Sequence, residues 1–300
     1  MQVLYGMSRD KELTQTEVVK RYNDAVQNSF ELYIFNLYYL TQIAAYSNND
    51  AARRSAKHLP SEEDKIFTPR LFENPIIQSL TNYEALEKEF LRYKMPGFVD
   101  EDNIRKLYVE FSKTKDYTVY FMKEECEGSD HRDILLKLYK HCSTNELYNE
   151  LIEERFPSWV DDKSLIVGTM KKTLKQLPDA PEFLDSYRPP FDTTTEFGEG
   201  LLVHVIEKDS ELLEMIEPTL KNWDAERVAV LDMILIKMAL SELIIFPTIP
   251  TKVTLNEFVE ISKMYSTDKS KDFINGILDR LMKKLNKEGK IKKEGRGLLE

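Results

Sequence analysis

The sequence has 300 residues, with 42 Lys and Arg against 52 Asp and Glu, and a formal net charge of −10. Its 42% hydrophobic content fits a soluble globular chain that is long enough to bury a core. Two cysteines, Cys126 and Cys142, exclude a disulfide framework. The chain has no apolar run of about 20 residues and no basic-then-apolar start, so we expect neither a membrane span nor a signal peptide and place the protein in the cytoplasm. The chain has only 10 glycines. This low number favours a helical fold over folds that need many glycines in turns and phosphate-binding loops.

Helical periodicity dominates the first 177 residues. Apolar residues recur at steps of three and four over 14–58, which predicts one long helix opened by a Thr14–Glu17 capping box. A polar loop is expected at 60–69. Further helices are predicted over 75–93, 102–125, 130–141, 145–153 and 161–177.

A proline-rich segment, 178–194, cannot continue the last of these helices and predicts a linker. Helical patterns return over 197–212 and 228–243. After Pro250 the pair Thr254 and Glu257 predicts a capping box, and Asp268 or Ser270 is expected to cap the last helix. Residues after 289 are expected to be basic and frayed. Strand-like alternation is nearly absent, so the predicted fold class is an all-α helical bundle.

Catalytic patterns are missing from the sequence. No glycine-rich phosphate loop follows a strand, and none of the four histidines belongs to a metal-binding helix motif. The sequence therefore predicts no catalytic residue, no metal, no cofactor and no enzymatic activity. In contrast, the segment 269–296 carries ten Lys and Arg against four Asp and Glu, which in an acidic chain marks a segment suited to nucleic acid.

The segment around and after Pro250 carries the sequence patterns that are most specific for a protein family. Residues 250–263 read PTKVTLNEFVEISK, residues 270–279 read SKDFINGILD, and the preceding helix reads DMILIKMALSEL over 232–243. These three patterns resemble the NusB family of transcription antitermination factors, with Lys237 where the family has arginine. The resemblance covers about 197–285.

This resemblance implies a non-enzymatic RNA-binding factor. It would act with the ribosomal protein NusE on boxA-like, single-stranded sequences in nascent ribosomal RNA, within the transcription elongation complex. Lysines near two helix N-termini would hold phosphates, and mid-helix Gly276 would permit close approach of another helix. The implied RNA- and partner-binding residues are Lys252, Asn256, Lys263, Lys269, Lys271, Phe273 and Asn275.

Two departures from the family pattern shape the domain hypothesis. The arginine-rich start of the family is missing, so we expect a truncated first helix; the alternative is a real loss of the arginines that would contact RNA. The chain is also about twice the usual family length, and the excess is acidic and tyrosine-rich, which suits protein contacts. We therefore predict N-terminal helices of a NusB-like body (1–58), an inserted helical module (59–177), the linker (178–194), NusB-like RNA- and partner-binding helices (195–288) and a basic tail (289–300).

Two other functions compete with this hypothesis. A helical protein-interaction scaffold without RNA binding would share the same composition. The same helical module also occurs as the N-terminal part of ribosomal RNA cytosine methyltransferases, but only fifteen residues follow Leu285 here, and we expect no catalytic domain among them.

Overall fold

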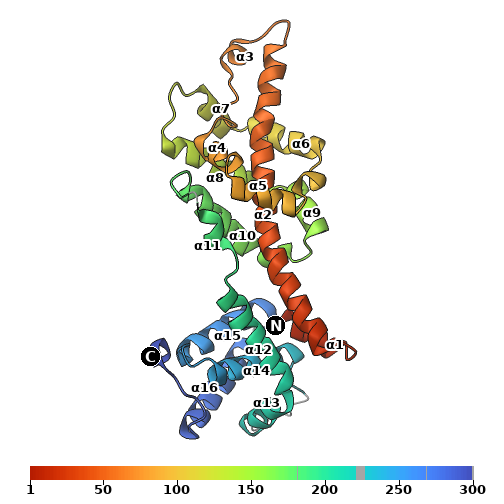
Figure 1. Cartoon of the computed structure of the whole chain (residues 1–300), viewed down its shortest axis with the longest axis vertical. Helices are drawn as coiled ribbons and strands as arrows, with labels where there is room; N and C mark the ends of the chain where they lie inside the picture. Colours follow the sequence, from red (N-terminus) through yellow and green to blue (C-terminus); the bar gives the residue numbers. More distant parts are fainter. Residues whose placement is uncertain (181, 221–226, 268, 299–300) are drawn as a thin grey trace. The chain divides into compact units, whose positions relative to one another are not determined.

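The computed structural model describes residues 1–180, 182–220, 227–267 and 269–298. These residues form helices, turns and loops without any strand, which confirms the all-α prediction (Figure 1). No helix in the described ranges is long and apolar enough to cross a membrane. The chain divides into two compact units: unit 1 comprises Met1–Val26 and Pro189–Glu300, and unit 2 comprises Gln27–Arg188.

The long helix α2 (Gln15–Ser55) contributes residues to both units. The predicted capping box is present at its start, where the backbone N–H of Thr14 donates to the Glu17 carboxylate at 2.8 Å and the Glu17 N–H donates to the Thr14 hydroxyl at 3.3 Å. Between residues 32 and 44 almost every side chain of α2 is buried. A helix that is buried all round forms the centre of a core, and in unit 2 the other helices pack around it (Figure 1).

Unit 2 contains more and shorter helices than the periodicity predicted. The predicted helix over 75–93 is divided at Asn82, and the one over 102–125 is divided where Thr114 caps a new helix by accepting from the N–H of Tyr117. The expected loop at 60–69 contains a short helix capped by Ser61. The elements of unit 2 after α2 are α3 (Glu62–Ile66), α4 (Pro75–Thr81), α5 (Glu84–Arg92), η1 (Met95–Phe98), α6 (Glu101–Ser112), α7 (Lys115–Met122), α8 (Gly128–Thr144), α9 (Glu146–Arg155), α10 (Trp159–Gln176) and α11 (Phe183–Tyr187).

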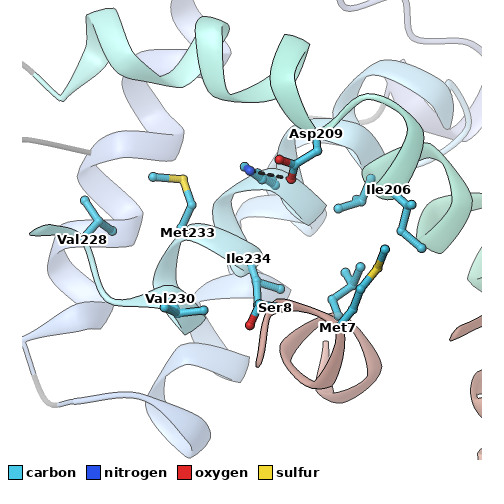
Figure 2. A pocket seen from close by; sticks show the side chains of 11 residues that line it. Met7, Ser8, Ile206, Asp209, Val228, Val230, Met233 and Ile234 are labelled. Atoms are coloured by element: carbon cyan, nitrogen blue, oxygen red, sulfur yellow. Dashed lines mark hydrogen bonds and ion pairs between the residues drawn. The ribbon is translucent and has the colours of Figure 1, made fainter. Parts of the chain in front are cut away.

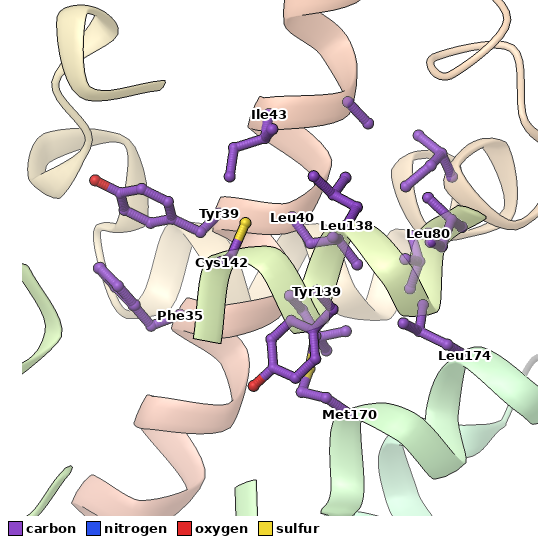
Figure 3. Close-up of a cluster of buried hydrophobic side chains, with 14 of the residues drawn as sticks. Phe35, Tyr39, Leu40, Ile43, Leu80, Leu138, Tyr139, Cys142, Met170 and Leu174 are labelled. Atoms are coloured by element: carbon purple, nitrogen blue, oxygen red, sulfur yellow. The ribbon is translucent and has the colours of Figure 1, made fainter. Parts of the chain in front are cut away.

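The core of unit 2 is rich in aromatic side chains (Figure 3). Tyr108, Tyr117, Tyr139 and Tyr148 are each at most 1% exposed. Their hydroxyls find partners inside the unit, as when Tyr108 and Tyr117 share a hydrogen bond of 2.9 Å. Burial of these four rings stabilises the unit itself, and the suggestion that the acidic, tyrosine-rich module serves protein contacts stays a prediction.

Unit 1 is built around helix α14, which packs against α1, α12, α13, α15 and α16. The predicted helix over 197–212 begins as a π-helical stretch and breaks at Lys208. Leu4 of α1 is buried in the same core as Leu235 of α14 and Leu278 of α16. The elements of unit 1 beside the start of α2 are α1 (Gln2–Arg9), η2 (Asp192–Glu199), α12 (Gly200–Glu207), α13 (Asp209–Ile216), η3 (Glu217–Thr219), α14 (Val230–Ile245), α15 (Thr251–Tyr265), α16 (Ser270–Lys287) and η5 (Gly295–Leu298).

The unit boundaries differ in position from the predicted domain boundaries. Unit 2 begins at Gln27, within α2, and ends at Arg188, whereas the predicted inserted module spans 59–177. The middle and end of α2 therefore share the core of the helices that follow it. That this module is an insertion into a NusB-like body stays a prediction.

Candidate RNA- and partner-binding site

The candidate site is a hairpin of two helices, α15 and α16. Helix α15 begins directly after Pro250, because a proline is accepted at the start of a helix but not in its interior. The predicted capping box at Thr254 is wrong. Thr254 lies one turn inside α15, fully buried, with its hydroxyl beside the carboxylate of Glu242.

Hydroxyl groups fix the connection between the two helices. Ser270 is buried, and its hydroxyl shares hydrogen bonds with Ser266 at 2.9 Å and with Thr267 at 2.8 Å. The Ser266 hydroxyl also donates to Asp232, a buried carboxylate in the first turn of α14. The Ser270 hydroxyl therefore stabilises the connection and does not cap α16, whose N-cap residue is Lys269, and no described side chain caps this helix start. The alternative cap, Asp268, lies outside the described residues.

The polar residues expected in the site are accessible. Lys252, Asn256 and Lys263 are exposed on α15, and Lys269, Lys271 and Asn275 are exposed at or near the start of α16. Phe273 is half-buried and packs against the core of unit 1. Lys263 forms an ion pair with Glu260, whereas no described carboxylate lies within ion-pair distance of Lys252, Lys269 or Lys271.

The structure does not gather these residues at one point. The two helix N-termini lie at opposite ends of α15, which has 15 residues and a length of about 22 Å. Lys263, Lys269 and Lys271 lie beside the α15–α16 connection, Lys252 lies at the other end of α15, and Asn256 lies between them. A single phosphate cannot contact both ends of α15, but an extended strand can.

Helix α1 borders two cavities that the sequence reasoning missed. One, of about 610 Å³, is lined by Tyr5 of α1, by Val230 at the start of α14, and by Tyr265 and Ser266 at the connection. Figure 2 shows the other, of about 440 Å³, on the side of α1 that carries Met7. These cavities depend on tertiary contacts of a short helix, which leave no periodic signal in the sequence.

The second cavity contains one ion pair among apolar side chains. Lys237, whose side chain is only 11% exposed, donates to Asp209 at 2.5 Å (Figure 2). Lys237 is the residue that replaces the family's arginine, and here its ammonium group joins α14 to the start of α13. Met7, Ile206 and Met233 form much of the apolar wall.

Mid-helix Gly276 does not touch another helix. A Cβ atom built there would meet only the guanidinium of Arg280, at 3.8 Å, so the expected close approach is wrong. Glycine in a helix interior is less stable than alanine by up to about 1 kcal/mol. We therefore expect Gly276→Ala to raise the free energy of unfolding by up to about 1 kcal/mol. Urea unfolding followed by circular dichroism checks this, and a destabilised variant would contradict it.

The His, Cys and acidic side chains of the described residues make structural contacts rather than forming a catalytic or metal-binding arrangement. No cluster of three or more His, Cys, Asp or Glu side chains among them has the arrangement of a metal site. Burial lowers the pKa of His131, whose ring shares a 2.8 Å hydrogen bond with the buried Tyr120. Burial raises the pKa of the Cys142 thiol to about 12, which disfavours the reactive thiolate.

The class of protein defined by these features is an all-α bundle with an exposed, lysine-bearing helical hairpin. Comparison with known families agrees: the NusB family model matches residues 167–283. The transcription antitermination protein NusB of Salinibacter ruber is 34% identical over 143 residues, 46% of this chain and 89% of that protein. The chain therefore belongs to the NusB family of transcription antitermination proteins.

Two further relatives carry the same name, transcription antitermination protein NusB. That of Chloroherpeton thalassium is 43% identical over 79 residues, 26% of this chain and 37% of that protein. That of Natranaerobius thermophilus is 45% identical over 74 residues, 25% of this chain and 53% of that protein. No solved structure matched the chain.

Proposed function

We propose that this chain is a non-enzymatic, cytoplasmic RNA-binding antitermination factor. It acts with the ribosomal protein NusE on boxA-like, single-stranded sequences in nascent ribosomal RNA, within the transcription elongation complex. The observation that carries the proposal is the exposed hairpin of α15 and α16, which presents the family's lysines and asparagines to solvent in a chain that belongs to the NusB family.

The chemistry of this hairpin suits a nucleic-acid strand. Lysine ammonium groups without carboxylate partners in the described part of the chain are available to phosphates, which supply most of the affinity and position the strand. The exposed amides of Asn256 and Asn275 offer donors and acceptors to base edges of an unpaired strand. Phosphate contacts and base contacts together are what a sequence-preferring, single-stranded RNA site requires.

Charge reversal at the start of α16 tests the proposal. We expect Lys269→Glu with Lys271→Glu to weaken boxA RNA binding at least tenfold, and to lower the salt dependence of the affinity, because two phosphate contacts become repulsive. Filter-binding titrations with and without NusE, at two or more salt concentrations, measure both effects.

A matched control exists in unit 2. Lys113 and Lys115 are exposed, have the same spacing and lie beside another helix start. Lys113→Glu with Lys115→Glu makes the same change in net charge, and we expect its RNA affinity to stay near that of the unmodified protein. Equal losses in both variants would mean that net charge alone governs binding. Absence of RNA binding by the unmodified protein, with NusE still bound, would favour the protein scaffold instead.

A further inference from the structure

The last described segment, residues 289–298, is a folded strap and not the frayed tail that the sequence predicted. Helix α16 ends at Lys287, and Gly289 follows it with φ +66°. The N–H of Lys290 donates back to the carbonyl of Leu285 at 3.0 Å, which is the left-handed ending that glycine favours. The chain then turns so that Ile291 packs against the core of unit 1. We call these residues the C-terminal strap.

The strap is attached to the loop between α14 and α15. The backbone N–H of Glu294 donates to the carbonyl of Pro247 at 2.9 Å, and the Lys293 ammonium donates to the carbonyl of Phe246 at 2.9 Å. Gly297 is buried, and a Cβ atom there would lie 1.9 Å from the Pro247 carbonyl oxygen. Only glycine allows this contact, so the position of the strap depends on Gly297.

This attachment brings a cation to the start of α15. Arg296 lines a largely apolar cavity of about 590 Å³ together with Pro250 and Val253, the residues on either side of the first turn of α15. Lys252 is exposed in that same turn. The strap therefore places Arg296 near the first turn of α15, the turn that carries Lys252.

Positive charge prevails in this region. The strap has four Lys and Arg and one Glu, and its Lys292 and Arg296 are exposed, with no ion pair to any described carboxylate. Of the acidic groups on the facing elements, Glu242 is buried, which raises its pKa and disfavours its charged form, whereas Glu257 is exposed. In a chain of net charge −10, such a local excess of cations fits a polyanion.

We propose that the C-terminal strap and Lys252 form a second phosphate-binding patch for the RNA strand that binds at the start of α16. This inference rests on the proposed function. The two patches are separated by the length of α15, so a single-stranded RNA that spans the hairpin would touch both. Arginine and lysine without an exposed aromatic ring in the strap favour contacts to the RNA backbone, which add affinity but no sequence preference.

Neutralising the strap tests this patch. We expect Lys292→Gln with Arg296→Gln to weaken binding several-fold at low salt. A plot of log affinity against log salt concentration has a negative slope, and the loss of two phosphate contacts on a single strand should make this slope shallower by about 1.4. The loss should be equal for boxA RNA and for an unrelated single-stranded RNA of the same length. A loss confined to boxA, or an unchanged slope, would overturn the proposal.

A second variant separates placement from charge. Gly297→Val keeps every charge but cannot fit against Pro247, so we expect it to cause a comparable loss of affinity by releasing the strap. Leu298→Ala is its control, because Leu298 is 67% exposed. If the charge variant weakens binding and Gly297→Val does not, the idea of a fixed patch is wrong, and the strap acts as a loose basic tail. Urea unfolding confirms that each variant is folded.

The failure of this inference is distinguishable from failure of the proposed function. If the unmodified protein does not bind RNA, both are overturned. If Lys269→Glu with Lys271→Glu weakens binding while Lys292→Gln with Arg296→Gln leaves affinity and slope unchanged, the proposed function stands and the second patch does not exist.

Discussion

Arg54→Ala is expected to lower the free energy of unfolding of unit 2 by about 2 kcal/mol, because two buried carboxylates lose their buried cationic partner and keep only the more exposed Arg53 and Lys57. The Arg54 Nε donates to Asp50 at 3.0 Å, and its Nη1 lies 3.4 Å from Asp64. Both carboxylates are almost fully buried, with side chains 2% and 4% exposed. The guanidinium also lies over the ring of Phe67, 4.2 Å from its centroid, and this contact is lost too. Urea unfolding at neutral pH measures the change.

The neighbouring arginine is the control. Arg53 contacts the same carboxylate, Asp50, at 2.6 Å, but its side chain is 69% exposed. In Arg53→Ala the carboxylate keeps Arg54 and the hydroxyl of Tyr108, which lies at 3.2 Å. We expect a cost below about 1 kcal/mol, as for other exposed ion pairs. Similar costs for the two variants would contradict the claim that burial decides the effect.

Periodicity predicted the helices that bury a continuous apolar face. The long helix over 14–58 was predicted almost to its ends, because its pattern is unbroken and its capping box is local in sequence. The breaks at Asn82 and Thr114 were missed, because the apolar spacing continues across them and only the tertiary packing selects a new helix start. The false capping box at Thr254 has a different cause: Pro250, a local signal, decides where α15 begins.

The candidate site was predicted residue by residue but not in its spatial arrangement. Exposure of Lys252, Lys263 and Lys271 followed from their positions opposite the apolar face of each helix. Their separation did not follow, since it depends on how α15 and α16 are joined. The place of the C-terminal strap was also beyond the sequence pattern, because it is held by two backbone carbonyls and by the absence of a side chain at Gly297.

Asn36 anchors a fully buried polar cluster in unit 2. Its Oδ1 accepts hydrogen bonds of 2.9 Å from Tyr139 and from Tyr148, and its Nδ2 donates to the carbonyl of Leu32. Asn36 has no exposed surface, and burial raises the pKa of both tyrosines, which keeps their hydroxyls protonated as donors. One side chain thus satisfies two hydroxyl groups that have no access to water.

Asn36→Leu is therefore expected to lower the free energy of unfolding by about 3–4 kcal/mol, since each unsatisfied buried hydroxyl costs about 1–3 kcal/mol. Urea unfolding compares it with Tyr139→Phe, which leaves Asn36 bonded to Tyr148 and should cost about 1 kcal/mol. Adding Tyr139→Phe and Tyr148→Phe to Asn36→Leu removes donors and acceptor together, and should recover much of the lost stability. No recovery would show that the loss comes from packing. At a temperature where Asn36→Leu is folded, its RNA affinity should be unchanged, because every residue assigned to RNA binding lies in unit 1.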